Sequence, residues 1–555
     1  MTAESDEQRA VADCPAAAGA ADDIVLVQAY AGAGKTTTLQ AYVERRPRTR
    51  FLYLCFNRTV QQSAEARFVG GAGDVDCRTL DSLALEYAES VARRHQSSGA
   101  PRRSVRDATR ALIADELSAV ERDAGADAAG VLRLLVAYCA DASHRDAPST
   151  ACFDALVRDM SKPAAPASLA RGRRTRQPSM DAAIRLWTRL VRGETSWFDH
   201  AVNRKLLFND GVDAAGWNGR WDEVLVDECQ DLSPMMVAIV VDGFRGRKLF
   251  VGDRHQHIYS FMGSVDAFDT LAPRASHSFA LAASYRFGAR IADVATRLVR
   301  RRHPNAPAVV GVAAQDAVTC AGIAAAAPTT PAADGGGAFV VLCRKNVNVF
   351  VQAVMAARAQ KRVHVYGQEA LVERVRSLYA AIGTDRWMRT LGAARREDDV
   401  DTLRLMRHIE RDPDEIVDSL AALRRQAVPR ESDAEVVFST VHKAKGGEWD
   451  RVKVHEDVFS PLTKANADAN DDDDALNIAY VACTRARRHL NLPRNGYELL
   501  FGGAVAVAPP TTADGNDDDV RRWRSSTERK RPTPRTRGGG DGFKRAAAAK
   551  RRTTS

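Results

Sequence analysis

The sequence predicts an α/β fold in which parallel strands end in loops that bind phosphate. Residues 24–28 form a buried apolar run that ends in a glycine-rich loop, and an apolar helical pattern follows from Leu39. Residues 221–226 form a second apolar run, which ends in Asp227-Glu228-Cys229-Gln230-Asp231. Open parallel sheets bind ligands beyond the carboxyl ends of their strands. Both loops are therefore expected at a nucleotide site.

The glycine-rich loop matches the phosphate-binding pattern G-x-x-x-x-G-K-[ST] except at its first position, where Ala29 replaces glycine. Gly32 and Gly34 let backbone N–H groups approach the phosphates, and Lys35 adds a positive charge at the β and γ oxygens. The Thr36 hydroxyl would complete a Mg²⁺ shell. The residues predicted to bind ATP here are Ala29, Ala31, Gly32, Ala33, Gly34, Lys35, Thr36 and Thr37. A chance alanine-rich turn is the alternative, but it would rarely supply Lys-Thr before a helix.

The acidic run after residue 226 suits the other half of such a site. An Asp-Glu pair at a strand end can hold Mg²⁺ and prepare a water for attack. A neighbouring strand is expected to lead into Gly252-Asp253, and Gln256 just beyond it could sense the γ-phosphate. An acidic run alone is usually a solvated turn, but one that closes a buried strand is not placed like a turn.

Composition places the chain among globular proteins. Its 555 residues are 45% hydrophobic and 27% charged, enough for two to four domains. The nine cysteines include no C-x-x-C pair, which favours reduced core thiols over zinc or iron–sulfur ligands. No stretch of about 18 uncharged apolar residues occurs, and the acidic start lacks the pattern of a signal peptide. A soluble, intracellular protein is expected.

The net charge of +9 is concentrated at the C-terminus. Residues 520–555 hold thirteen Lys or Arg against Glu528 and Asp541, an excess of +11, which leaves −2 for residues 1–519. Proline and glycine interrupt this segment, so residues 506–555 are expected to be a disordered basic tail. The tail could bind nucleic acid or protein partners, or direct nuclear import; otherwise a cytoplasmic location is expected. A solubilising tail is the alternative.

Two strand ends upstream suit a track for single-stranded nucleic acid. Phe56 and Asn57 end the run at residues 51–55, and Ser82 follows another strand. A base can stack on an aromatic ring while amide and hydroxyl groups hold the backbone. Phe56 alone would more often belong to the core, and Tyr259 and Phe261 carry the same ambiguity.

The second half of the chain reads as another sheet domain. Residues 339–346 and 436–450 repeat the pattern of a strand followed by a polar loop, but no second phosphate loop occurs. One nucleotide is therefore expected between the halves, with Arg286 and Arg485 reaching its γ-phosphate as arginine fingers. Each arginine alone would more often be a surface residue.

Seven segments in order carry a family resemblance: Gln8, AYAGAGKT, DECQD, GDRHQHIY, SYRF, TVHKAKGGEW and YVACTRA. Over about residues 4–495 the chain resembles superfamily 1A helicases of the UvrD/Rep type, most closely the helicase core of F-box DNA helicases. The resemblance implies two RecA-like P-loop NTPase domains, each with a helical insertion. It also implies ATP- and Mg²⁺-dependent 3′-to-5′ movement on single-stranded DNA and at duplex junctions, in repair, recombination or replication.

The resemblance also implies residue roles. Gln8 would read adenine, Tyr285 would stack on it, and Glu448 would approach the ribose. Thr36 and Asp227 would hold Mg²⁺, and Glu228 would be the catalytic base. Lys35 would hold the phosphates. The charge of the γ-phosphate would be stabilised by Gln256, Arg286 and Arg485. The DNA track would include Phe56, Asn57, Ser82, Phe261, Arg344, Asn346, His442 and Lys443.

The chain departs from the family pattern at three positions outside the hydrolytic set. Asp81 stands where the family has His, and its negative charge is expected to weaken DNA contact. Met262 stands where an Arg links nucleotide to DNA, and Ala475 replaces an acidic residue. ATP hydrolysis is thus the firmer expectation. A translocase that displaces proteins without efficient unwinding is the main alternative, followed by a DNA-binding protein with a vestigial ATPase.

The motif order implies domain boundaries. Residues 1–85 and 186–275 would form the first RecA-like domain, 1A, with a helical insertion, 1B, at residues 86–185. Residues 276–383 and 434–505 would form the second domain, 2A, with a small helical insertion, 2B, at residues 384–433. Residues 313–337 read as a loop. The segment after residue 490 is too short for a nuclease domain.

Overall fold

The computed structural model describes residues 4–15, 23–55, 58–68, 73–95, 128–160, 173–192, 200–259, 266–320, 338–396, 400–411, 413–463 and 469–502. Three residues expected on the DNA track, Phe56, Asn57 and Phe261, lie outside this part of the chain, as do Met262 and the basic tail. Within the helices and strands described, no helix is long and apolar enough to cross a membrane.

The first sheet has six parallel strands in the order β3-β2-β4-β5-β1-β6. The strands are β1 (Ile24–Ala29), β2 (Arg50–Cys55), β3 (Asp74–Thr79), β4 (Glu223–Val226), β5 (Arg247–Gly252) and β6 (His277–Leu281). Successive residues of a strand face opposite sides, so Phe51 and Leu52 pack into different hydrophobic cores. A sheet buried on both faces explains the nearly continuous apolar runs of the sequence. The predicted α/β fold is confirmed.

The helices that flank this sheet are α1 (Asp6–Ala12), α2 (Lys35–Glu44), α3 (Arg58–Phe68), α10 (Pro234–Gly243) and α11 (Ala267–Leu271). Strand β6 corrects the boundary expected at residue 275, because Val25 to Ala29 of β1 pair with His277 to Leu281. Alternate side chains of this edge strand are exposed, so its sequence lacks the continuous apolar run by which the central strands were found.

The second sheet also has six parallel strands, in the order β11-β12-β10-β13-β14-β9. They are β9 (Ala317–Cys320), β10 (Phe339–Cys343), β11 (Val363–Val365), β12 (Val436–Thr440), β13 (Trp449–Val454) and β14 (Ala486–Leu492). Strand β9 corrects the loop expected over residues 313–337, since Ala317 to Cys320 pair with His489 to Leu492. A four-residue edge strand is too short to show a reliable pattern.

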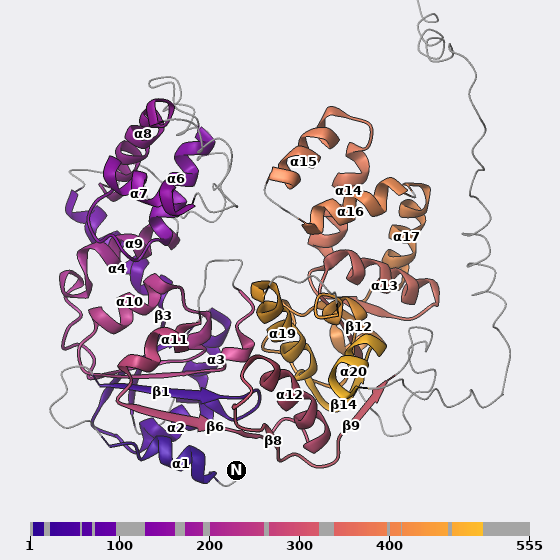
Figure 1. Ribbon diagram of the computed structural model, residues 1–555, viewed down its shortest axis with the longest axis horizontal. Helices are drawn as coiled ribbons and strands as arrows, with labels where there is room; N and C mark the ends of the chain where they lie inside the picture. Colours follow the sequence, from indigo (N-terminus) through magenta and orange to yellow (C-terminus); the bar gives the residue numbers. More distant parts are fainter. Residues whose placement is uncertain are drawn as a thin grey trace, which may run out of the picture. The chain divides into compact units, whose positions relative to one another are not determined.

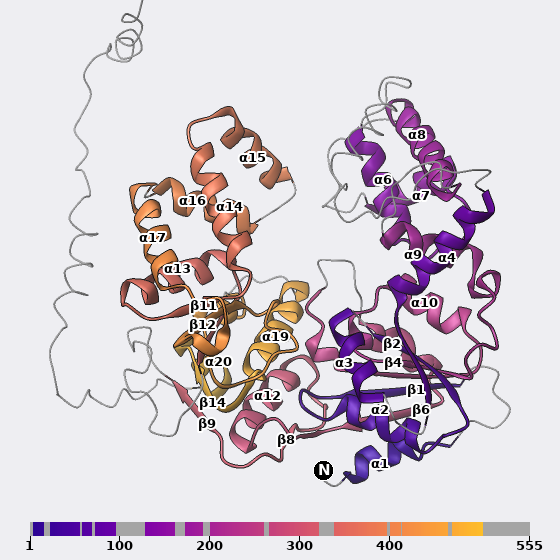
Figure 2. The same cartoon turned by 180° about the vertical axis from the view of Figure 1, so that it is seen from behind.

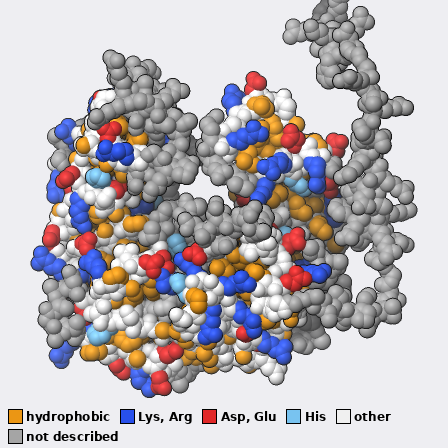
Figure 3. Space-filling model, viewed as in Figure 1, with side chains coloured by type: hydrophobic (Ala, Val, Ile, Leu, Met, Phe, Trp, Pro, Cys, Tyr) orange, Lys and Arg blue, Asp and Glu red, His pale blue; other side chains and the backbone are white. Residues whose placement is uncertain are grey.

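Helices α12 (Ala289–Arg302), α13 (Asn346–Arg358), α18 (Glu456–Phe459), α19 (Ala469–Cys483) and α20 (Arg494–Phe501) accompany this sheet, and β7 (Ala283–Ser284) pairs with β8 (Val310–Gly311). Helix α12 buries one side and carries arginines on the other, and Figure 3 shows Lys and Arg side chains gathered over it. Arg297 and Arg301 donate hydrogen bonds to the carbonyls of Leu500 and Leu499, the last turn of α20. Part of this basic surface therefore serves helix packing.

Two groups of helices interrupt the sheets (Figures 1 and 2). The first comprises α4 (Leu80–His95), α6 (Ala128–Ala140), α7 (Thr150–Met160), α8 (Arg173–Val191) and α9 (His200–Asp210), and α6 to α8 share one hydrophobic core. Helices α4 and α8 run through the boundaries expected at residues 85 and 185. The second group comprises α14 (Gln368–Ala381), α15 (Asp385–Arg396), α16 (Val400–Arg411) and α17 (Pro413–Gln426), which share a core with α13.

Candidate active site

The glycine-rich loop joins β1 to α2 in a shape that requires glycine. Gly32 and Gly34 have φ values of 76° and 79°, in the left-handed region, and Gly34 is the N-cap of α2. A Cβ atom at Gly32 would lie 2.6 Å from the Cβ of Arg286, and one at Gly34 would lie 2.6 Å from Nε2 of Gln8. Ala29, Ala31 and Ala33 are buried, whereas Thr37 is exposed on the first turn of α2. The loop thus places unpaired N–H groups at a helix N-terminus, where anions bind.

The acidic strand end lies against this loop. Nζ of Lys35 is 3.3 Å from Oε1 of Glu228, and Oγ1 of Thr36 is 3.5 Å from Oδ2 of Asp227. Tyr53 donates a 2.7 Å hydrogen bond to the same Asp227 oxygen. Glu228 adopts φ 55°, one of only two positive φ values among the described non-glycine residues. Strained backbone of this kind persists where surrounding contacts enforce it.

Burial and neighbouring charges set the protonation of the acidic pair. Burial, together with the adjacent Glu228, raises the pKa of Asp227 to about 6. Burial also acts to raise the pKa of Glu228, but Lys35 and Lys445 outweigh it and lower this pKa to about 2. The two carboxylates therefore differ, with the negative charge held most firmly on Glu228.

The same residues fit a magnesium ion. Mg²⁺ prefers carboxylate and hydroxyl oxygens, and Asp227 and Thr36 offer one of each on adjoining strand and helix ends. The buried Asp227–Glu228 pair brings two carboxylates together with Lys35 in contact, and burial together with Glu228 raises the pKa of Asp227. Thr36 and Asp227 are thus the side chains that would hold the ion.

Residues of the second sheet complete the site. Arg485, which follows α19, is 1% exposed and donates from Nη2 to Oε1 of Gln256 over 3.3 Å. Burial and the nearby Arg286 lower the pKa of Arg485 to about 9. Arg286 follows β7 and pairs through Nε with Oε2 of Glu448 at 2.7 Å, while its Nη1 donates to the carbonyl of Thr484. The structure therefore brings Lys35, Glu228, Gln256, Arg485 and Arg286 to one region.

The residues expected around the base and ribose lie at the rim of this region. Gln8 is 5% exposed, caps α1 together with Ser5, and donates from Nε2 to the carbonyl of Ala33. The backbone N–H of Tyr285 donates to the carbonyl of Gly32 over 2.9 Å. Glu448 contacts Arg286 in this state, so its carboxylate is already engaged.

Four of the described residues expected on the DNA track follow the paired strands β10 and β12 of the second sheet, namely Arg344, Asn346, His442 and Lys443, whereas Ser82 follows β3 of the first. Ser82 lies in the first turn of α4, where its N–H donates to the Thr79 hydroxyl and its own hydroxyl accepts from the Thr79 N–H. Asn346 donates to Asp401 of α16 at 2.6 Å, and Lys443 donates to the carbonyl of Tyr366 at 3.3 Å. His442 bonds the carbonyl of Ile258, and the backbone N–H of Arg344 bonds Asp457.

Asp81 is not the isolated charge that the sequence suggested. Its carboxylate contacts Arg204, and His200 lies 3.9 Å away, both on α9. The expected repulsion of a phosphate backbone is therefore offset by a partner 123 residues along the chain. Sequence reasoning missed this pair because nothing local connects the two positions.

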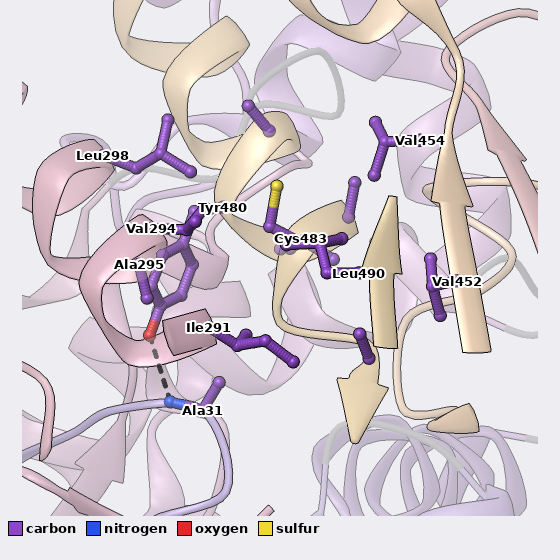
Figure 4. Packing of buried hydrophobic residues seen from close by; sticks show 14 of the residues in the cluster. Ala31, Ile291, Val294, Ala295, Leu298, Val452, Val454, Tyr480, Cys483 and Leu490 are labelled. Atoms are coloured by element: carbon purple, nitrogen blue, oxygen red, sulfur yellow. Dashed lines mark hydrogen bonds between the residues drawn. The ribbon is translucent and has the colours of Figure 1, made fainter. Parts of the chain in front are cut away.

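Four further residues of the site were also missed. Both carboxylate oxygens of Asp231 accept hydrogen bonds from Nζ of Lys445 at 2.6 Å. Asn477 donates to the carbonyl of His257 at 2.8 Å. The Tyr480 hydroxyl donates to Asp253 at 3.0 Å and accepts from the N–H of Ala31 at 3.1 Å (Figure 4). Tyr480 lies in an apolar helical pattern and reads as core, which hides its hydroxyl role. Lys445 lies within the TVHKAKGGEW segment, the one signal that could have singled it out.

Another cluster lies at the end of β10. Ligand atoms of Cys343, His455 and Asp457 lie within 4.8 Å of one another. Asp457, however, accepts hydrogen bonds from the backbone N–H groups of Arg344 and Lys345 and from Asn348. Its oxygens thus close the turn after the strand.

Sequence comparisons relate the chain to one family of known proteins. Residues 11–268 match the UvrD/REP helicase N-terminal domain, and residues 435–492 match the UvrD-like helicase C-terminal domain. F-box DNA helicase 1 of Gallus gallus is 25% identical over 523 residues, which cover 86% of this chain and 48% of the relative. F-box DNA helicase protein 1 of Schizosaccharomyces pombe is 26% identical over 302 residues, 54% of this chain and 33% of the relative.

The chain spans about half the length of the first relative and a third of the second. The two family matches together cover more than half of its residues and fall on the two parallel sheets, one match to each. The sheets are those of two RecA-like domains, and the chain belongs to the UvrD/REP helicase family.

Proposed function

We propose that this protein is an ATP-dependent DNA helicase or translocase that moves 3′-to-5′ on single-stranded DNA. The observation that carries the proposal is a connected set of hydrogen bonds and ion pairs. On the first sheet, Lys35 pairs with Glu228, which connects to Gln256 through Gln230 and Asp253. Arg485 of the second sheet then donates to Gln256. Such a set suits a hydrolysis reaction that depends on how the two halves meet.

In the proposed reaction, the loop at Gly32 to Lys35 holds the phosphates of ATP through backbone N–H groups and the Lys35 ammonium. Glu228 accepts a proton from the attacking water, and Gln256 orients that water or the γ-phosphate. Arg485 and Arg286 stabilise the charge that develops on the transferred phosphoryl group. A magnesium ion, when bound by Thr36 and Asp227, would neutralise the β and γ oxygens.

Arg286 must change partners for this role, because its guanidinium contacts Glu448 and the Thr484 carbonyl. ATP would compete with these contacts and draw the two sheets together, and hydrolysis would release them. Alternating grip on the strand through Ser82, Arg344, Asn346, His442 and Lys443 would convert each cycle into a step.

The direct test is ATPase activity with and without single-stranded DNA, compared for the wild type and Glu228→Gln. We expect the variant to lose roughly 10²- to 10⁴-fold in kcat, the usual contribution of a general base, while it still binds ATP. Lys35→Ala should lose ATP binding as well. Normal hydrolysis by both variants would refute the proposal.

Substrate and direction need a second measurement. Single-stranded DNA should stimulate the ATPase more than RNA does, and duplexes with a 3′ tail should be unwound in preference to those with a 5′ tail. Unwinding from the 5′ tail would overturn the polarity. Repair and recombination are the processes in which such an activity would serve.

A translocase that displaces proteins from DNA without efficient unwinding is the second candidate. The observation that favours it is Met262, which stands where the family has an arginine. Displacement of a bound protein and separation of strands, measured on one preparation, would distinguish the two activities. The contacts of Lys35 with Glu228 and of Arg485 with Gln256 argue against a vestigial ATPase.

A further inference from the structure

The loop between β12 and β13 sends neighbouring side chains in two directions. Residues 441–446 form consecutive turns, and this short segment holds His442 and Lys443, two of the residues proposed for the DNA track. Two positions further on, Lys445 contacts the first sheet. Its Nζ lies 2.6 Å from both carboxylate oxygens of Asp231 and 2.9 Å from the carbonyl oxygen of Gln256.

These contacts use the hydrogen-bonding capacity of the ammonium. Lys445 has three N–H donors, and the Asp231 carboxylate and the Gln256 carbonyl accept them, with the ring of Tyr259 4.8 Å away. The Lys445 side chain is 12% exposed and that of Asp231 is 2% exposed. A buried ion pair of this kind gives little net stability, so its value lies in fixing the relative positions of its partners.

Both partners of Lys445 belong to the hydrolytic centre. Asp231 is the last residue of the single-turn 3-10 helix η2 (Cys229–Asp231), which begins directly after Glu228. Glu228 holds a left-handed backbone conformation, so a displacement of this turn changes the direction of its side chain. Gln256, the other partner, contacts Arg485.

We propose that Lys445 is a positioning residue that couples occupancy of the DNA track to ATP hydrolysis. The proposal rests on the helicase or translocase function argued above. DNA that engages His442 and Lys443 shifts the turn that also carries Lys445. Through Asp231, this shift moves the turn that sets Glu228, and through the Gln256 carbonyl it moves the residue in contact with Arg485. The link does not involve Met262.

Two variants test this link. Lys445→Met keeps the length of the side chain without its charge, and Asp231→Asn keeps the shape of the carboxylate. We expect the ratio of DNA-stimulated to unstimulated kcat to fall roughly tenfold in both, within the usual range of coupling between sites. KM for ATP and the affinity for single-stranded DNA should stay near those of the wild type, because the ammonium of Lys445 contacts Asp231 and the Gln256 carbonyl and no side chain of the phosphate loop or the proposed track.

Controls separate coupling from a general loss of structure. Lys361→Met removes an ammonium of the same domain that pairs with Glu435 at 3.0 Å on the surface, and it should retain full stimulation. Lys445→Arg keeps the charge and should recover part of the stimulation. If Lys445→Met does not fold, Asp231→Asn, which is isosteric, decides the question.

The double variant Asp231→Asn/Lys445→Met should lose no more stimulation than the more affected single variant, because both changes remove one link. Additive losses, or full stimulation in the single variants, would overturn the inference. If the wild type itself shows no stimulation by DNA, both the inference and the proposed function fail. A stimulated wild type with equally stimulated variants refutes the inference alone.

Discussion

The two sheets share one architecture but bring opposite charges to their junction. Each has six parallel strands. The loops of the first sheet carry Asp227, Glu228, Asp231 and Asp253, with Lys35 among them, whereas Lys445 and Arg485 reach the junction from the second. Burial raises the pKa of Asp231 to about 6 and lowers that of Arg485 to about 9. On both sides of the junction, burial therefore disfavours the charged form of the side chain. The site therefore combines acids on the loops of the first sheet with cations that reach it from the second.

The largest effect should come from removing the buried cation of the second sheet. Arg485→Ala removes the donor to Oε1 of Gln256 and takes away a positive charge proposed to act on the γ-phosphate. We expect kcat of the DNA-stimulated ATPase to fall by roughly 10³-fold or more, as for other arginine fingers. Steady-state hydrolysis at saturating ATP measures this. Arg487→Ala removes a half-exposed neighbour and should have little effect on kcat. Equal losses of kcat in the two variants would contradict the proposed role of Arg485 as the buried cation of the second sheet.

The reverse change, removal of an acid from the first sheet, should stabilise the protein. The pKa of Asp227 is raised from 3.8 to about 6, so the folded state holds this proton more tightly than the unfolded state. Ionisation of Asp227 therefore costs stability at pH 8, and the cost disappears as pH falls from 6 towards 4. Without nucleotide or Mg²⁺, Asp227→Asn should raise the free energy of unfolding at pH 8 by up to about 3 kcal/mol.

Denaturant unfolding between pH 5 and pH 8 checks this prediction, and the gain should shrink as the pH is lowered. Asp213→Asn provides the control, since this exposed carboxylate pairs only loosely with Arg245 at 3.5 Å and its replacement should change stability by less than about 0.5 kcal/mol. A loss of stability in Asp227→Asn at pH 8 would show that the hydrogen bonds of the Asp227 carboxylate contribute more to the free energy of unfolding than burial of its charge costs.

A smaller effect should follow from exposing the charge of Asp81. Arg204→Gln removes its partner, and the free carboxylate should weaken binding of single-stranded DNA by roughly fivefold, about 1 kcal/mol, at low salt. Fluorescence anisotropy with a labelled oligonucleotide would measure the affinity. The double variant Asp81→Asn/Arg204→Gln should restore most of it. Unchanged affinity in the single variant would place Asp81 away from the DNA.

The sequence predicts those parts of the fold and the site that depend on residues close together in the chain. Gly34-Lys35-Thr36 after a buried strand fixes a loop and a helix start, and Asp227-Glu228 after another buried strand fixes the acidic end. These patterns depend on residues within about ten positions of one another. The edge strands β6 and β9 lack such patterns, because one is half exposed and the other is four residues long.

The contacts that join the halves have no local cause. Lys445 and Asp231 are 214 residues apart, and Tyr480 meets Ala31 across 449 residues. Their pairing depends on how the two sheets pack, which neither charge nor periodicity reveals. The pairing of Asp81 with Arg204 is equally non-local, since the two residues are 123 positions apart.

That pair has a mechanical consequence. Asp81 and Arg204, together with the 2.7 Å hydrogen bond between Tyr87 and Asp210, fasten α4 to α9 where the chain leaves the first sheet and where it returns. Because these two contacts hold α4 and α9 together, the first and last helices of this group are expected to move as one unit. A displacement of the group would then be transmitted to β3, the strand that leads into Asp81.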